Sequence, residues 1–248
     1  MHGPDFARPS PEHIEVLKRA SSASITSMLR RRDVHKIGIA LKPVVPGLNR
    51  VVGPALTLRS VPGREDIRPL AYQPETLYPG HPDDAIEALQ PGDVLVHDGL
   101  GLTSEGLFGD LLVYRIKMRG AAGLVSWMCI RDRPHMAERE LPIFCLGSIS
   151  QGGTVYNVDY NVPINCAGTL VIPGDVVVGD EDGLAVIPQA LVPQVVEDVQ
   201  YHEEREVFLR KLLAEGAPLK GTYPPSEETD RRFREWREQM RREGRSIL

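Results

Sequence analysis

Two aspartates and one arginine stand at a spacing in which a fold could bring their side chains together. Asp110 begins a stretch with a helical pattern, and Arg131-Asp132 follows after 20 intervening residues. A hard cation such as Mg²⁺ binds few protein oxygens and keeps several waters, so two nearby carboxylates suit it. The planar fork of an arginine suits a carboxylate or a carbonyl oxygen. Each feature alone is common, as a helix-capping aspartate or as a surface Arg-Asp pair, so a site requires the fold to unite them.

The elements around these residues predict that they converge. Residues 110–119 have a helical pattern that Gly120 ends, and the uncharged run 122–130 indicates a buried strand. Because the helix runs one way and the strand returns, the helix start and the strand end lie at one edge of the sheet, where open α/β sheets bind ligands. The helix start also offers unpaired N–H groups to an anion. The helical residues expected to face inward are Leu111, Leu112 and Ile116.

The other patterned stretches predict a mixed α/β body. Ser10-Pro11-Glu12 is typical of a helix start, and Pro-Gly-Asp turns at 91–93 and 173–175 precede apolar runs that indicate buried strands. We expect the first of these strands to end near His97, with a glycine-rich loop after it. The remaining expected elements are a helix over residues 11–20, a strand over 51–60, a helix over 83–89 and a short helix from Pro134.

The last part of the chain has a different character. Residues 201–248 carry 21 charged side chains in 48, whereas residues 1–200 carry 42 in 200. An amphipathic helix is expected over 188–215, a turn-rich break over 216–226, and a very polar helix over 227–245 with Phe233, Trp236 and Met240 on one stripe. Three interpretations stay open for this segment: a solvated tail, an arm that grips a neighbouring subunit, or an RNA-binding element that uses its seven arginines.

Composition narrows the class of protein. The 248 residues are 42% apolar and 25% charged, with a net charge of −5, which excludes a wholly disordered chain and provides no general basic field for nucleic acid. The three cysteines match no zinc or redox pattern, which favours a reducing compartment. No apolar stretch reaches the ~20 residues that span a bilayer, and no signal peptide is recognisable at the start. We therefore expect a cytoplasmic protein with no membrane partner.

Other chemical motifs are weaker. The sequence contains no GxSxG, HExxH or P-loop motif. His97 and His135 fall near the predicted edge, and we expect both to be structural. Cys129 lies inside the uncharged strand, so an inert buried thiol is favoured over a nucleophile.

The spacing of Asp110 and Arg131-Asp132 resembles the D-x20-R-D signature of the 4-hydroxy-4-methyl-2-oxoglutarate aldolases, which are related to the regulator of ribonuclease activity A. The resemblance covers roughly residues 14–216. Further matching blocks are Gly53–Thr57, Pro91–Val96, Gly109–Leu112, Arg119–Gly123, Pro173–Asp175 and Asp182-Gly183.

The resemblance implies a fold and an assembly. The fold would be a single compact α/β/β/α sandwich resembling the swivelling phosphohistidine domain, with helices at both ends of the chain. Residues 1–216 would form the catalytic domain and residues 217–248 a charged helical arm. The protein would be a homo-oligomer, a trimer or a dimer of trimers, with sites between subunits. Glu206 of a neighbouring subunit would join the metal shell.

The resemblance also implies roles for the matched residues. Asp132 would ligate Mg²⁺ or Mn²⁺, and Asp110 would hold a metal-bound water. Arg131 would bind the keto acid, and the backbone after Gly109, at Leu111 and Leu112, would hold the carboxylate of that substrate.

The activity implied is that of a divalent-metal-dependent lyase that releases pyruvate from a 4-hydroxy-2-keto acid, with oxaloacetate decarboxylation as a side activity. Two alternatives remain: a non-catalytic regulator that binds a ribonuclease complex, and another keto-acid or sugar-acid decarboxylase or dehydratase on the same scaffold. The sequence departs from its relatives at Trp127-Met128, where many have Asp-Gly, and at Thr26-Ser27-Met28, where many have Ser-Asp-Ala.

Overall fold

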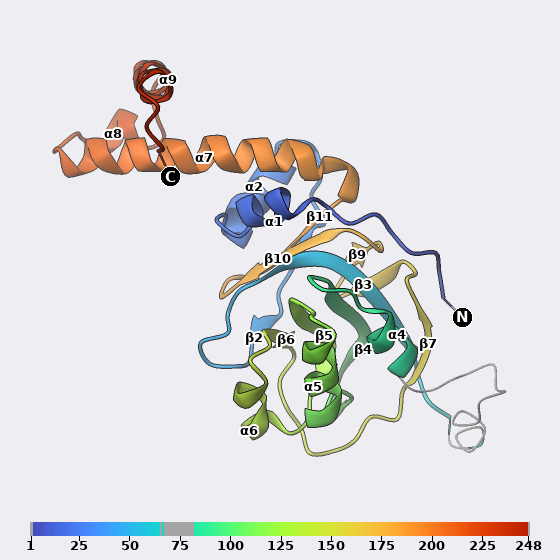
Figure 1. Cartoon of the computed structure of the whole chain (residues 1–248). Coiled ribbons are helices and arrows are strands. Elements are labelled where there is room, and N and C mark those ends of the chain that lie inside the picture. The colour runs from blue at the N-terminus through green and yellow to red at the C-terminus, as the bar shows by residue number, and fades with distance from the viewer. Residues whose placement is uncertain (1, 65, 67–81, 248) are drawn as a thin grey trace. The chain divides into compact units, whose positions relative to one another are not determined.

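A curved central sheet organises the first part of the chain (Figure 1). The structure, a computed structural model, describes residues 2–64, 66 and 82–247. The chain separates into two compact units, residues 1–193 and 194–248. The sheet and the helices that cover it belong to the first unit.

The sheet has nine strands among the described residues, in the order β1-β11-β10-β3-β4-β5-β6-β2, with β7 beside β3. Strands β3, β4, β5 and β6 are parallel to one another, and the other pairs are antiparallel. A separate hairpin joins β8 to β9. The strands are β1 Gly38–Ile39, β2 Lys42–Pro43, β3 Val51–Val61, β4 Val94–Gly106, β5 Gly123–Cys129, β6 Ile143–Cys145, β7 Tyr156–Tyr160, β8 Ile164–Cys166, β9 Thr169–Val171, β10 Val176–Asp180 and β11 Gly183–Ile187.

Strand β3 connects the two halves of this sheet. Residues 51–54 pair with β10, and residues 55–59 pair with β4. Buried aliphatic side chains from both halves, including Val96, Val125 and Val177, form one interior cluster, so the two halves face each other. At the far ends of the sheet, β1 and β2 are separated by only two residues of chain.

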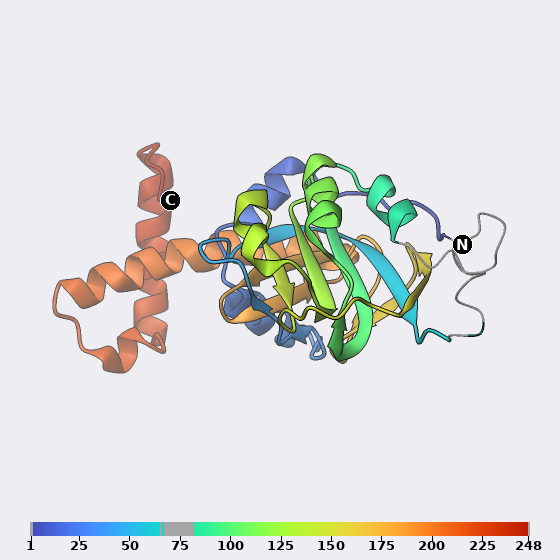
Figure 2. The ribbon, with the colours of Figure 1, turned by 90° about the horizontal axis from the view of Figure 1, so that it is seen from below.

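Helices cover the outer faces of the sheet in the first unit (Figure 2). Helices α4 and α5 pack Ile86, Val113 and Ile116 against Leu95 and Leu124 of the parallel strands. Helix α2 contacts β10 and β11 on the other half. The helices among the described residues of this unit are α1 Pro11–Leu17, α2 Ser22–Arg30, α4 Asp83–Ala88, α5 Asp110–Met118, α6 Arg133–Met136 and two short 3₁₀ turns, η1 Ala137–Arg139 and η2 Gln189–Leu191. The expected mixed α/β class is confirmed, and the likeness to the phosphohistidine domain stays a prediction.

Most of the expected elements are present, and α1 shows how the sequence determines its start. Ser10 is the N-cap, and its Oγ accepts a hydrogen bond from the His13 amide at 3.3 Å. The helix ends at Leu17 rather than at residue 20. There the guanidinium of Arg50, which is distant in sequence, donates hydrogen bonds to the carbonyl oxygens of Leu17 and Lys18, both at 3.0 Å.

The prediction of a glycine-rich loop after His97 is wrong. Strand β4 continues to Gly106, and its pairing with β5 shifts between His97 and Leu102 and again before Gly106. Leu100 and Gly101 have φ angles of 62° and 71°, so they bend the strand without ending it. The glycines therefore mark irregularities within a strand.

The second unit is helical. Helix α7, Val192–Ala214, runs into this unit, which also contains α8, Leu219–Thr222, and α9, Glu227–Arg242. Phe233 of the polar helix α9 is fully buried against Phe208 of α7, with Trp236 packed beside them. Phe233 and Trp236 of the predicted apolar stripe therefore pack inside this unit. The predicted domain boundary at residue 216 falls at the turn after α7 and stays a prediction. In the part of the chain that the structure describes, every helix is too short or too polar to cross a bilayer.

The Pro-Gly-Asp turn before β4 supplies a test of the fold. The Asp93 carboxylate is fully buried and accepts hydrogen bonds from Arg8 Nε at 2.8 Å and Nη2 at 2.9 Å. Asp5 also pairs with Arg8, at 3.2 Å, but its side chain is 61% exposed. We expect Asp93→Ala to lower the free energy of unfolding by about 3 kcal/mol, because it removes the buried carboxylate that binds Arg8 and leaves that charge only the exposed Asp5 as a partner. Asp5→Ala should cost less than about 0.5 kcal/mol. Urea denaturation measures both, and equal losses would contradict this assignment.

Candidate functional site

The start of α5 and the end of β5 meet, as the sequence predicts. Gly109 is the N-cap of α5, and the Asp110 amide donates a hydrogen bond to Asp132 Oδ2 at 3.2 Å. A Cβ atom at Gly109 would lie 2.7 Å from Asp132 Oδ2, so a larger residue there would displace this carboxylate oxygen. The predicted site residues Gly109, Asp110 and Asp132 therefore lie together.

The amides of Leu111 and Leu112 follow in the first turn of α5, where no carbonyl of the helix reaches them. The Leu111 side chain is 79% exposed, which contradicts the inward orientation expected for it. Leu112 packs partly against the core, and Val113 occupies the inward position. The two amides retain the capacity of a helix N-terminus to bind an anion.

Arg131 lies in a slot walled by glycines. Its backbone amide bonds to the Phe108 carbonyl at 2.9 Å. A Cβ atom at Gly106 would lie 3.1 Å from Arg131 Cγ, and one at Gly152 would lie 3.4 Å from Arg131 Nη1. The Nε atom is buried and has no hydrogen-bond partner within the described residues, and no described carboxylate pairs with this side chain. A partly buried guanidinium whose buried Nε has no partner is suited to a carboxylate or carbonyl oxygen of a ligand.

Asp132 begins the turn that follows. It has a left-handed backbone, with φ 56°, and is the N-cap of α6. Its side chain is exposed and forms no ion pair with the rest of the described chain. The described residues contain no cluster of three or more histidine, cysteine or acidic side chains. One chain thus offers no closed set of protein ligands among the described residues, so a hard cation at Asp132 would need water and ligand oxygens to complete its shell.

Asp110 has a partner that sequence reasoning missed. Its carboxylate accepts hydrogen bonds from Arg139, from Nε to Oδ1 and from Nη2 to Oδ2 at 3.0 Å. The hydrogen bond from Arg139 lowers the pKa of Asp110 below its ordinary value, and the charges of Arg139 and His135 act in the same direction. No motif pointed to Arg139, because only the turn through α6 and η1 brings it back to α5.

His97 and Cys129 are structural, as expected. His97 is fully buried between the hydroxyls of Ser60, at 2.7 Å, and Ser126, at 3.0 Å. Burial lowers the pKa of His97 to about 3, so its ring is neutral. Burial also raises the pKa of the Cys129 thiol, which disfavours a reactive thiolate.

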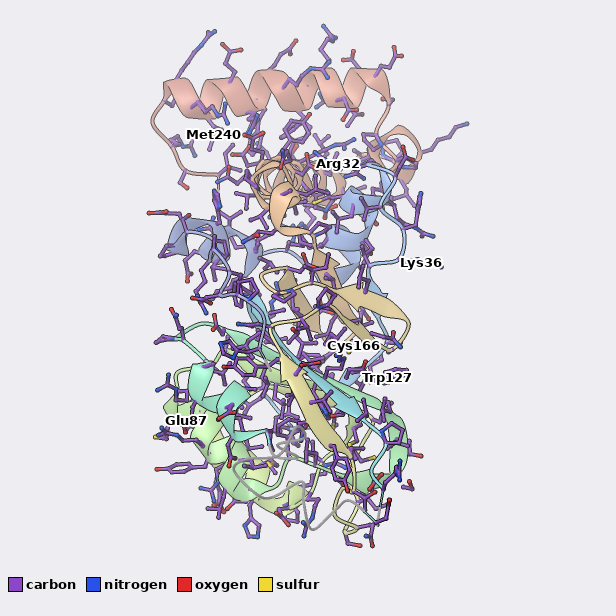
Figure 3. The ribbon with its side chains drawn as sticks, turned by 90° about the vertical axis from the view of Figure 1, so that its right-hand side faces the viewer. Arg32, Lys36, Glu87, Trp127, Cys166 and Met240 are labelled. Carbon is purple, nitrogen blue, oxygen red and sulfur yellow. The ribbon has the colours of Figure 1, made fainter. Side chains whose placement is uncertain are left out.

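Trp127 lies on the face of β5 that is turned away from α5. It packs against the interior cluster that contains Cys166 (both are labelled in Figure 3), whereas Leu124 of the same strand packs on the α5 side. A Cβ atom at Gly101 would lie 2.9 Å from the indole ring. Met128 is fully buried. The bulky residue at position 127 is thus accommodated by the bend in β4.

Glu206 lies on α7, where its carboxylate is 3.8 Å from Arg210. Its expected role at the metal of a neighbouring subunit stays a prediction.

Comparison with known proteins gives a consistent picture. A family model described as Aldolase/RraA matches residues 23–186. A protein of Halalkalibacterium halodurans named "Putative 4-hydroxy-4-methyl-2-oxoglutarate aldolase" is 33% identical over 150 residues, which cover 60% of this chain and 65% of the relative. An uncharacterised protein of Methanocaldococcus jannaschii is 30% identical over 123 residues, 49% of this chain and 59% of the relative. The chain therefore spans less than two thirds of the length of these two relatives.

Two solved structures share the fold. The Streptomyces coelicolor protein RraAS2, described as an unusual member of the RNase ES inhibitor RraA protein family, is 34% identical. It has a TM-score of 0.69, with 83% of this chain and 98% of that chain covered. An uncharacterised protein of Pseudomonas syringae has a TM-score of 0.76 at 21% identity, with 90% and 98% covered, and supports the fold alone.

The buried imidazole predicts a dependence of stability on pH. The unfolded chain takes up a proton on His97 near its ordinary pKa of 6.5, whereas the folded chain does so only at about 3. The contribution of this neutral ring is complete above pH 6.5 and is lost as the pH falls, by about 1.4 kcal/mol for each pH unit. Urea denaturation between pH 6.5 and 5 should show this slope, and His97→Gln should reduce it. An equal slope in both proteins, or NMR signals of a protonated His97 ring at pH 5, would refute the assignment.

Proposed function

Since the chain belongs to the Aldolase/RraA family, we propose that it is a divalent-metal-dependent lyase that cleaves a C–C bond of a 4-hydroxy-2-keto acid and releases pyruvate. The observation that carries the proposal is the buried Arg131 Nε, which has no hydrogen-bond partner among the described residues, next to the Asp132 carboxylate, which forms no ion pair among them. The aldolase names of relatives that are about one third identical support the same class.

The proposed substrate is held by two kinds of donor. Arg131 presents a planar fork to the carboxylate or the ketone oxygen of the keto acid. The free amides of Leu111 and Leu112 at the start of α5 stabilise a carboxylate. Mg²⁺ or Mn²⁺ would be held by Asp132, and the chemistry it supplies when bound is polarisation of the carbonyl group and stabilisation of negative charge.

The remaining steps use groups of the chain. The C3–C4 bond breaks, the C4 hydroxyl becomes a carbonyl as its proton leaves, and the electron pair forms the enolate of pyruvate. Arg131 stabilises the enolate oxygen by hydrogen bonding. The Asp110 carboxylate, which Arg139 keeps ionised, accepts the hydroxyl proton through a water. Protonation of C3 completes pyruvate, and oxaloacetate decarboxylation passes through the same enolate.

A second candidate function is supported by the Streptomyces protein, whose description places it in a family of ribonuclease inhibitors. In this alternative, the chain binds a ribonuclease complex and catalyses no reaction. A decarboxylase or dehydratase acting on another keto acid or sugar acid would use the same arginine and aspartate. Substrate turnover separates these possibilities.

We expect the purified protein to release pyruvate from hydroxy-keto diacids or oxaloacetate when Mg²⁺ or Mn²⁺ is added. A lactate dehydrogenase assay measures the pyruvate. EDTA should abolish the release. Arg131→Ala should reduce the rate by at least about 100-fold, because it removes the donor to the developing oxyanion.

The matched control for this assay is Arg115→Ala, which removes an exposed arginine of α5 that pairs with Glu87. It should retain the wild-type rate. Activity that survives both EDTA and Arg131→Ala would exclude the proposed mechanism. Absence of turnover on all keto acids, together with binding to a ribonuclease complex, would favour the regulator.

The proposed enzyme is a homo-oligomer, a trimer or a dimer of trimers, and its C-terminal segment contributes to assembly. Truncation after Gly216 removes α8 and α9 and should lower the number of subunits in the oligomer, as measured by analytical ultracentrifugation. Because the truncation also uncovers Phe208, a full-length Arg237→Gln variant, which loses the pair with Glu204 and the contact with the Tyr201 ring, serves as control and should keep its oligomeric state. An unchanged oligomer of the truncated chain would refute the role in assembly.

A further inference from the structure

Residues 132–139 form hydrogen bonds with both the main chain and the side chain of Asp110. Asp132, at the beginning of this stretch, accepts the hydrogen bond of the Asp110 amide. Arg139, near its end, binds both oxygens of the Asp110 side chain. The main chain and the side chain of Asp110 are therefore fixed independently.

The stretch that provides these contacts is bounded by two left-handed residues. Asp132 has φ 56° and Glu140 has φ 50°, so the chain turns sharply before α6 and after η1. Lys117 of α5 donates to the Glu140 carbonyl at 2.7 Å, which ties the second turn to the same helix. The position of Arg139 relative to α5 is thus determined from both sides.

The Arg139 side chain is itself restrained. Its guanidinium lies 5.5 Å from the ring centre of Tyr114, one turn along α5 from Asp110, and 3.9 Å from the Glu138 carboxylate. The side chain is 22% exposed, which is less than for most ion-paired arginines on this surface. Both members of the pair are therefore partly buried, and Arg139 has further contacts with Tyr114 and Glu138.

We propose that Arg139 is a positioning residue, which holds the Asp110 carboxylate in the orientation that the proposed lyase reaction requires. Each carboxylate oxygen can accept a further hydrogen bond after Arg139 has taken one. The remaining acceptor positions are then fixed in space and are available to the substrate hydroxyl or its water. This role rests on the proposed function.

The chain contains a matched pair for comparison. Arg115 also binds a carboxylate through Nε and Nη2, both at 2.6 Å from Glu87, which is labelled in Figure 3. Both of its members are about half exposed, and the pair joins α5 to α4. Arg115→Gln therefore removes the same chemical interaction from the same helix without touching Asp110.

The test compares Arg139→Gln, Arg139→Lys and Arg115→Gln in steady-state pyruvate release with Mg²⁺. We expect Arg139→Gln to lower kcat by about 100-fold with KM unchanged, because a displaced group reduces rate more than binding. Arg139→Lys, which keeps one charged donor, should recover part of the loss. Arg115→Gln should match the wild type. Binding of Mn²⁺ alone, measured by its electron paramagnetic resonance signal, should be equal in all of these proteins.

A crystal structure of Arg139→Gln provides a readout that is independent of turnover, and it should show the Asp110 carboxylate rotated from its wild-type position. An unmoved carboxylate, or a kcat equal to that of Arg115→Gln, would overturn the role of Arg139. A raised KM with an unchanged kcat would also overturn it, because Arg139 would then bind substrate directly. A wild type that turns over no keto acid would instead overturn the proposed function.

Discussion

The hydrogen bond from the Asp110 amide to the Asp132 carboxylate is the contact on which the arrangement of the candidate site depends. It links the first residue of a helix to the turn that follows the next strand, and it satisfies one of the donors that every helix leaves unpaired. An anionic acceptor is favoured there because the helix N-terminus carries partial positive charge. Position 109 carries no Cβ atom, which leaves room for Asp132 Oδ2 at this place. A larger residue at position 109 would displace that carboxylate oxygen.

The charges around this contact are unevenly compensated. Arg139 neutralises Asp110, whereas Arg131 and Asp132 have no charged partner within the described residues. A buried donor without a partner, such as the Arg131 Nε, is costly in a folded protein. A ligand with an anionic group for Arg131, together with a cation for the Asp132 carboxylate, would give both residues a charged partner. A metal-chelating acid satisfies this requirement better than a neutral ligand.

Local patterns in the sequence were sufficient to predict the elements and the convergence of Asp110 with Arg131-Asp132. Helix α5, strand β5 and the Ser10 cap of α1 depend on short-range periodicity and capping, which are visible in a single chain. The missed features depend on contacts between residues distant in sequence. The bend in β4 is determined by its pairing with β5, and the capture of Asp110 by Arg139 is determined by two left-handed turns. Helix α5 starts at the expected residue, but its buried face runs through Val113 and Ile116, which leaves Leu111 outside that face.

The two ends of the central sheet have a consequence for the behaviour of the protein in solution. Long exposed strand edges present rows of unpaired N–H and C=O groups, which recruit other chains into continuous sheets. Here the end strands β1 and β2 contain two residues each and follow one another closely along the chain. Curvature that brings these ends together leaves little backbone on which a foreign strand could add. The same closure that encloses the aliphatic interior thus limits the addition of a foreign strand at these two ends of the sheet.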